Sequence, residues 1–134
     1  MTFDIGLSAE VTHVVTEDDT AATYGSGLAP VLSTPHLVAL MENAAQAALN
    51  PHMAEGQSAV GTHIDMRHLA ATPVGMEVRV RAELQEVEGR RLRFHIEAWD
   101  EVEKIGEATH ERFIIDMARF MRGVEAKRGR TDAE

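Results

Sequence analysis

The chain has 134 residues, of which 44% are apolar and 26% charged, and its formal net charge is −9. This length and composition predict one globular domain over residues 1–120, followed by a polar C-terminal tail over residues 121–134. The acidic balance argues against nucleic acid as a partner, because phosphate binding needs a basic surface. The absence of cysteine excludes disulfides, thiolate nucleophiles and cysteine-ligated zinc.

Nothing in the sequence predicts contact with a membrane. No segment approaches the roughly 18 apolar residues that span a bilayer. The first ten residues, MTFDIGLSAE, contain neither a basic region nor the apolar centre of a signal peptide. We therefore expect a cytoplasmic protein.

The first expected element is a strand over residues 9–16, AEVTHVVT, which are rich in β-branched side chains and contain no turn residue. The next stretch, EDDTAATYGSGLAPVLS, combines acidic and small residues with glycine and proline. It predicts a helical turn followed by a loop of the kind that can act as a lid.

A long helix is expected next, within STPHLVALMENAAQAALN. Ser33 or Thr34 can cap its start, and Pro35 suits the first helical position because its missing N–H would be unpaired there. The Asn50–Pro51 pair ends it. Apolar residues recur at three- and four-residue spacing, at Leu37, Leu40, Met41, Ala44 and Ala48. A helix with so little charge is normally buried on most sides.

From Ser58 onward the apolar period changes to two, which predicts four antiparallel strands. The first places Val60, Thr62, Ile64, Met66 and His68 on one face. The others are expected over residues 76–85, 92–98 and 105–117, and the polar end of the chain suggests a short terminal helix. The order of elements predicts an α+β fold in which one antiparallel sheet wraps around the long central helix.

Two residues do not fit their apolar surroundings. Glu42 is the only formally charged side chain between Pro35 and Asn50, and a buried carboxylate must be paired, hydrogen-bonded or protonated. His68 stands where an apolar residue is expected on its strand. If the strand packs on the helix, the two groups can tune each other's proton affinity, which suits general acid–base catalysis. The structural alternatives are a solvent-facing Glu42 and a hydrogen-bonded core histidine.

Two further positions are candidates for the same site. Thr34 at the helix start is either the N-cap or a functional hydroxyl. Gly61 either marks a β-bulge or lets a ligand approach a backbone N–H, as a bound oxyanion requires. The seven histidines show no spacing of a known metal motif, so no metal is predicted.

Four blocks of sequence together resemble the hotdog-fold thioesterases typified by fluoroacetyl-CoA thioesterase. They are STPHLVALMENAA, GTHIDMRHLAATPVG, VEGRRLRFHIEAWDE and IGEATHERF, within residues 8–120. The resemblance implies a hotdog fold and a homodimer, in which two sheets join edge to edge and higher oligomers are possible. It implies an acyl-CoA thioesterase that hydrolyses a short acyl-CoA to the free acid and CoA. CoA is then part of the substrate, and no separate cofactor is expected.

The same resemblance implies an active site at the dimer interface. The catalytic threonine, glutamate and histidine of the family match Thr34, Glu42 and His68. Gly61 matches the backbone amide that holds the thioester carbonyl, and Arg112 matches an arginine that organises the substrate pocket.

Substrate and reaction class remain open at this stage. Members specialised for fluoroacetyl groups carry bulky aromatics before the helix, whereas this chain has Tyr24 there and no phenylalanine, so another short acyl group is an equal alternative. An enoyl-CoA hydratase-type lyase is a second hypothesis, although its acid and histidine usually lie close together in the sequence. A non-catalytic acyl-CoA-binding module is the third.

Overall fold

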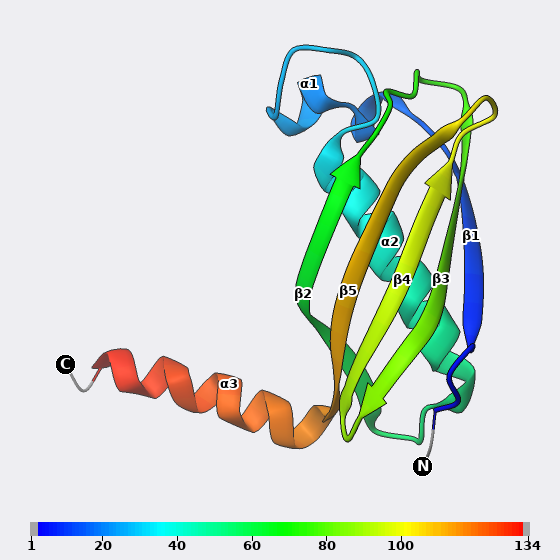
Figure 1. The fold of residues 1–134 in the computed structure, drawn as a ribbon. Helices are drawn as coiled ribbons and strands as arrows, with labels where there is room; N and C mark the ends of the chain where they lie inside the picture. Colours follow the sequence, from blue (N-terminus) through cyan, green and yellow to red (C-terminus); the bar gives the residue numbers. More distant parts are fainter. Residues whose placement is uncertain (1–2, 133–134) are drawn as a thin grey trace.

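The computed structural model describes residues 3–132 and confirms the α+β hotdog fold (Figure 1). In chain order the elements are β1 (Ser8–Val14), the 3-10 helix η1 (Glu17–Asp19), α1 (Ala21–Tyr24), α2 (Thr34–Leu49), the 3-10 helix η2 (Asn50–His52), β2 (Gln57–His68), β3 (Glu77–Glu88), β4 (Arg91–Trp99), β5 (Lys104–Asp116) and α3 (Met117–Asp132).

The sheet has the order β1-β3-β4-β5-β2, and each neighbouring pair is antiparallel. It curls around α2, which crosses its concave face (Figure 1). The edge strands are β1 and β2. Among residues 3–132, β2 pairs along one side only, with β5.

Helix α2 begins at a well-formed cap. The hydroxyl of Ser33 accepts a hydrogen bond from the backbone N–H of His36, so Ser33 is the N-cap and Thr34 is the first helical residue. The hydroxyl of Thr34 is therefore not required for capping. The helix buries its apolar side against the sheet through Leu37, Leu40, Met41, Ala44, Ala45, Ala48 and Leu49.

The predicted face of β2 is correct in its second half and wrong in its first. The register with β5 shifts between Gly61 and His63, which is a β-bulge. The bulge brings Gly61 to the inner face, while Thr62 is exposed. Extending the alternation back from Ile64 therefore assigned Val60 and Thr62 to the wrong face of the sheet. The extra residue of the bulge exchanges the two faces for the residues that precede it.

Helix α3 follows β5 directly and projects away from the sheet (Figure 1). It covers most of the region predicted as a polar tail. A hollow of about 660 Å³ lies between α3 and the end of β5, and of the residues predicted for the site none lines it. Among residues 3–132, no helix is long and apolar enough to cross a bilayer.

Candidate active site

Thr34 and His68 form a hydrogen-bonded pair at the start of α2 and the end of β2. Thr34 Oγ1 lies 2.8 Å from His68 Nδ1. Both residues line a hollow of about 520 Å³, whose other walls come from the segment before α2 and from the residues that follow β2. This volume is in the range of small-molecule pockets.

His68 is an uncharged imidazole in this setting. Burial lowers its pKa below the ordinary histidine value, and the backbone of Ala70 only partly opposes that effect. Its Nε2 is buried and has no well-formed hydrogen-bond partner among the described residues. A neutral imidazole with one nitrogen on a hydroxyl and the other uncommitted can move protons in either direction.

Glu42 lies two turns further along α2, in a group that we call the Glu42–Arg112 group: Glu42, Gly61, His110 and Arg112. Glu42 Oε2 is 3.5 Å from Arg112 Nη1, and the side chain of Glu42 remains 42% exposed in the single chain. A Cβ added at Gly61 would lie only 2.7 Å from Glu42 Oε2. The glycine therefore lets the carboxylate approach the backbone of β2.

Arg112 is held in place by buried and half-buried partners. Its Nη2 donates to the side chain of Gln46 and to the carbonyl of Ala59, both at 3.0 Å. Its Nη1 lies 3.2 Å from His110 Nε2. Burial lowers the pKa of the Arg112 guanidinium, and the nearby Glu42 opposes that shift. Arginine stays charged even so, because its ordinary pKa lies far above neutrality.

His110 is a site residue that the sequence analysis did not identify. It is only 1% exposed. Its Nδ1 lies 2.7 Å from the carbonyl oxygen of His63 and must donate to it, which leaves Nε2 to accept from Arg112. Burial first, and then the charge of Arg112, lowers the pKa of His110, in agreement with this neutral form. The period of two in β5, which places Ala108, His110 and Arg112 on one face, was the available signal.

The five predicted residues thus form two separate groups in one chain. Thr34 lies beside His68, and Glu42 lies beside Gly61 and Arg112. Eight residues of helix separate Thr34 from Glu42, or about 12 Å along the axis. The structure shows no contact between Glu42 and His68 within residues 3–132. The catalytic assignment therefore stays a prediction.

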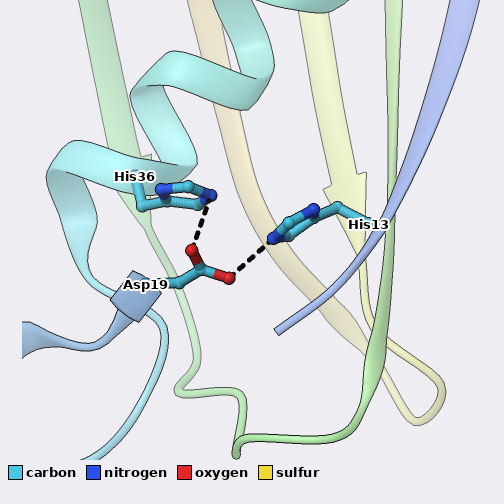
Figure 2. Close-up of side chains that lie close together, drawn as sticks. All are labelled: His13, Asp19 and His36. Atoms are coloured by element: carbon cyan, nitrogen blue, oxygen red, sulfur yellow. Dashed lines mark hydrogen bonds and ion pairs between the residues drawn. The ribbon is translucent and has the colours of Figure 1, made fainter. Parts of the chain in front are cut away.

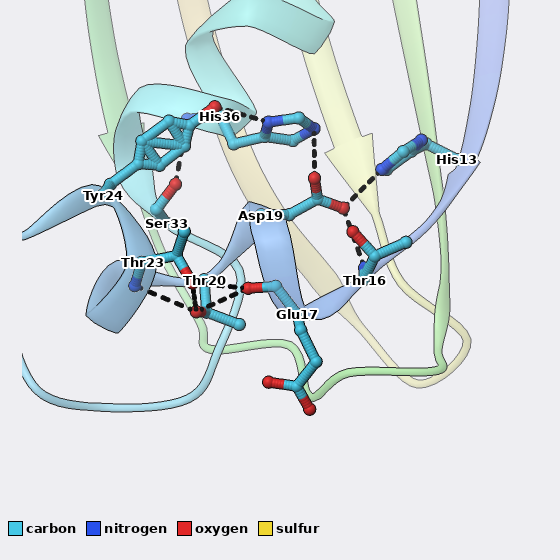
Figure 3. Close-up of polar contacts among 9 residues, drawn as sticks. All are labelled: His13, Thr16, Glu17, Asp19, Thr20, Thr23, Tyr24, Ser33 and His36. Carbon is cyan, nitrogen blue, oxygen red and sulfur yellow. Dashed lines mark hydrogen bonds and ion pairs between the residues drawn. The ribbon is translucent and has the colours of Figure 1, made fainter.

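A second polar cluster connects the segment that was predicted to act as a lid to β1 and to α2. Asp19 of η1 contacts His13 of β1 and His36 of α2, and Tyr24 of α1 contacts His36 (Figure 3). The residues come from four elements, so no spacing in the sequence indicated that they meet.

Residues 15–118 match the model of a protein family, FlK, fluoroacetyl-CoA-specific thioesterase. The chain belongs to this family. A fluoroacetyl-CoA thioesterase from Streptantibioticus cattleyicolor is 44% identical over 97 residues, which cover 72% of this chain and 70% of that protein.

Solved structures agree with this family membership. The structure of the fluoroacetyl-CoA thioesterase FlK superimposes with a TM-score of 0.89 at 36% identity, covering 95% of this chain and 98% of that one. A thioesterase superfamily member from Thermus thermophilus superimposes with a TM-score of 0.90 at 32% identity, covering 98% and 97%. These matches confirm the family and the fold inferred from the four sequence blocks.

Proposed function

We propose that this protein hydrolyses a short acyl-CoA thioester to the free acid and CoA. The observation that carries the proposal is the hydrogen bond between Thr34 and a neutral His68 beside a pocket, in a chain of a thioesterase family. Thr34, Glu42 and His68 act as catalytic residues, while Gly61 and Arg112 bind and organise the substrate. No cofactor is needed, since CoA is part of the substrate.

In the proposed reaction the backbone N–H of Gly61 polarises the thioester carbonyl. Glu42, assisted by Thr34, either attacks the carbonyl carbon or takes a proton from the water molecule that attacks it. The C–S bond then breaks, and His68 passes its proton to the departing thiolate. In the general-base route, His68 regains a proton from Glu42, which took it from the attacking water. In the covalent route, a water molecule hydrolyses the anhydride on Glu42, which releases the free acid and returns a proton to His68. Arg112 places a positive charge beside Glu42 and holds the carboxylate near Gly61.

We further propose that the complete site forms between two chains. One side of β2 has no partner strand in the part of the chain that the structure describes. Antiparallel pairing of two such edges about a two-fold axis sets the Gly61 end of one strand beside the His68 end of the other. The Glu42–Arg112 group of one chain would then face the Thr34–His68 pair of its partner, and the exposed face of Glu42 would be covered.

An acyl-CoA panel tests the activity itself. Purified protein is expected to release free CoA from at least one acyl-CoA in a series from acetyl to dodecanoyl, with fluoroacetyl-CoA included. Glu42→Ala should abolish the release. Crotonyl-CoA serves as the comparison for lyase chemistry. Loss of its enoyl absorbance without release of CoA, or tight binding without turnover, would contradict the proposal.

Mixing two inactive variants tests the shared site. Glu42→Ala and His68→Ala are each expected to be inactive as homodimers. Dimers assembled from an equal mixture should recover roughly a quarter of wild-type activity, because half of the dimers are mixed and each mixed dimer holds one intact site. Turnover of a short acyl-CoA is the measurement.

A second mixture provides the matched control. Thr34 and His68 belong to the same chain of each proposed site, so a mixture of Thr34→Ala with His68→Ala should remain inactive. Recovery in this control, or no recovery in the first mixture, would show that the catalytic residues are not divided between chains as proposed. Single turnover in heavy-oxygen water then separates the two roles of Glu42, since label in its carboxylate requires a covalent anhydride.

A further inference from the structure

Three metal-ligating side chains from three elements converge beside the start of α2 (Figure 2). His13 Nε2 lies 2.6 Å from one carboxylate oxygen of Asp19, and His36 Nε2 lies 3.3 Å from the other. One ligand atom of each residue lies within 4.8 Å of the other two. Two imidazole nitrogens therefore lie close together at the same carboxylate, one beside each oxygen.

The outer partners of these groups are also in place (Figure 3). The Tyr24 hydroxyl lies 2.8 Å from His36 Nδ1, which directs Nε2 of that ring toward Asp19. The backbone N–H of Thr16 donates to Asp19 Oδ2 at 2.8 Å. Metal-ligating histidines and carboxylates in proteins are usually oriented by such second hydrogen bonds.

Asp19 is an ionised carboxylate although its side chain is only 8% exposed. Burial alone would raise its pKa, but hydrogen bonds from Thr16 and His13, together with the nearby His36, lower it below the ordinary value. Two more acids, Glu17 and Asp18, precede it in the same short helix. The locality therefore carries negative charge that attracts a cation.

Hydrogen bonding within the cluster leaves one atom unsatisfied. His36 Nε2 is buried, and among residues 3–132 it makes no hydrogen bond, despite its short distance from Asp19. A buried polar nitrogen without a hydrogen bond carries a cost, which the ion-pair contact with Asp19 offsets in part. Coordination of a cation by its lone pair would remove that cost.

We propose that His13, Asp19 and His36 bind a divalent transition-metal ion of the zinc class. Two imidazoles and one carboxylate are a donor set that suits zinc and its borderline neighbours better than magnesium or calcium. Three protein ligands leave at least one coordination position for water. His13 is about one-third exposed, which gives the ion a path from solvent.

The bound ion would join β1, η1 and the first turn of α2. His36 follows Thr34 by two residues, so the ion would fix the predicted lid segment next to the Thr34–His68 pair. We expect the ion to stabilise the contacts among β1, η1 and the first turn of α2. The reaction proposed above does not require it.

Zinc titration of the tag-free, chelator-treated full chain tests this site. We expect calorimetry to give one zinc ion bound per chain, and Co²⁺ to give visible absorption bands typical of a site with nitrogen ligands. The melting temperature should rise by about 5 °C or more at saturating zinc. Magnesium should give no comparable binding, because it prefers an oxygen-only shell.

Two variants locate the ion. His13→Ala removes a partly exposed ligand, and Asp19→Asn keeps an oxygen for Thr16 while removing the charge. Each should weaken zinc binding by at least about tenfold, a loss seen even when outer partners are removed. His95→Ala is the matched control, because His95 is also a strand histidine beside a carboxylate, that of Glu97. It should leave the affinity unchanged.

The result has two outcomes. Weakened binding in both variants, with folded protein verified by circular dichroism, supports the site. Absence of one-to-one zinc binding, or equal affinity in wild type, His13→Ala and Asp19→Asn, overturns it. The cluster would then be a hydrogen-bonded anchor for the segment between β1 and α2.

Discussion

Gly61 of β2 lies close to the carboxylate of Glu42 and to two buried side chains of β5, His110 and Arg112. A Cβ there would lie 2.7 Å from Glu42 Oε2, 3.2 Å from His110 Cε1 and 3.4 Å from Arg112 Nη1. The nearest of these atoms is the end of a partly exposed, flexible side chain, whereas the buried ring of His110 must shift by a few tenths of an ångström, so the fold accommodates alanine mainly by moving Glu42. Glycine is therefore needed at this bulge more for the position of the Glu42 carboxylate than for the stability of β2.

Gly61→Ala is accordingly expected to separate activity from stability. We expect kcat/KM to fall by about 100-fold, because displacing a reacting group by about 1 Å can cost that much. The melting temperature should fall only modestly, through the small shift of His110. Gly123→Ala is the control, since a Cβ at that helical glycine meets nothing within 4 Å. Full activity in Gly61→Ala would show that Glu42 need not stand against β2 to function.

At the scale of elements, the contact between α2 and β5 also depends on one glycine. A Cβ at Gly106 would lie 3.0 Å from Leu37 Cδ2, 3.1 Å from Met41 Cε and 3.3 Å from the carbonyl oxygen of Arg67. Leu37 and Met41 are fully buried. Because well-packed cores have little space for extra atoms, this position limits how closely the helix can approach the sheet.

Gly106→Ala should therefore show the opposite behaviour to Gly61→Ala. Overpacking of the core is expected to lower the free energy of unfolding by about 1–3 kcal/mol, since the helix must move away from the strand. Chemical denaturation with one equilibrium probe for α2 and one for the sheet measures it. An unchanged midpoint would mean that the two core side chains repack without cost.

The sequence predicted the elements well because their patterns are local. Ser33, Pro35 and Asn50–Pro51 delimit α2, and period-two alternation locates the four later strands. The β-bulge was one of the two interpretations of Gly61, but it did not enter the assignment of strand faces, because an inserted residue leaves no trace in the local pattern except a glycine with several explanations. Thr34 and His68, by contrast, were assigned to one site from the sequence. They meet because the end of β2 packs beside the start of α2.

What the sequence could not predict are the contacts between distant residues. The positions of Arg112 and His110 depend on hydrogen bonds to Gln46, to the carbonyl of Ala59 and to the carbonyl of His63, all on other elements. The cluster of His13, Asp19 and His36 depends on how three elements meet in space. In both cases the chemistry lies in tertiary contacts, which residue types and spacing alone do not specify.

At the scale of the whole molecule, each chain presents two unlike groups of polar residues and an edge strand paired along one side only. The proposed dimer unites these features. Light scattering of the purified protein should give about 29 kDa, twice the 14.7 kDa of one chain. A monomer at the concentration where the enzyme is active would contradict the proposed arrangement.

If the active site forms across the unpaired side of β2, catalysis depends on the concentration of the protein. If each active site needs two chains, the number of sites depends on the square of the free-chain concentration once the protein is diluted below its dissociation constant. Specific activity should then decline on dilution while each chain retains its own hydrophobic core. Turnover per chain, followed over a dilution series at low and at saturating acyl-CoA, would reveal this second-order dependence. Saturating acyl-CoA should oppose the loss by holding the two chains together.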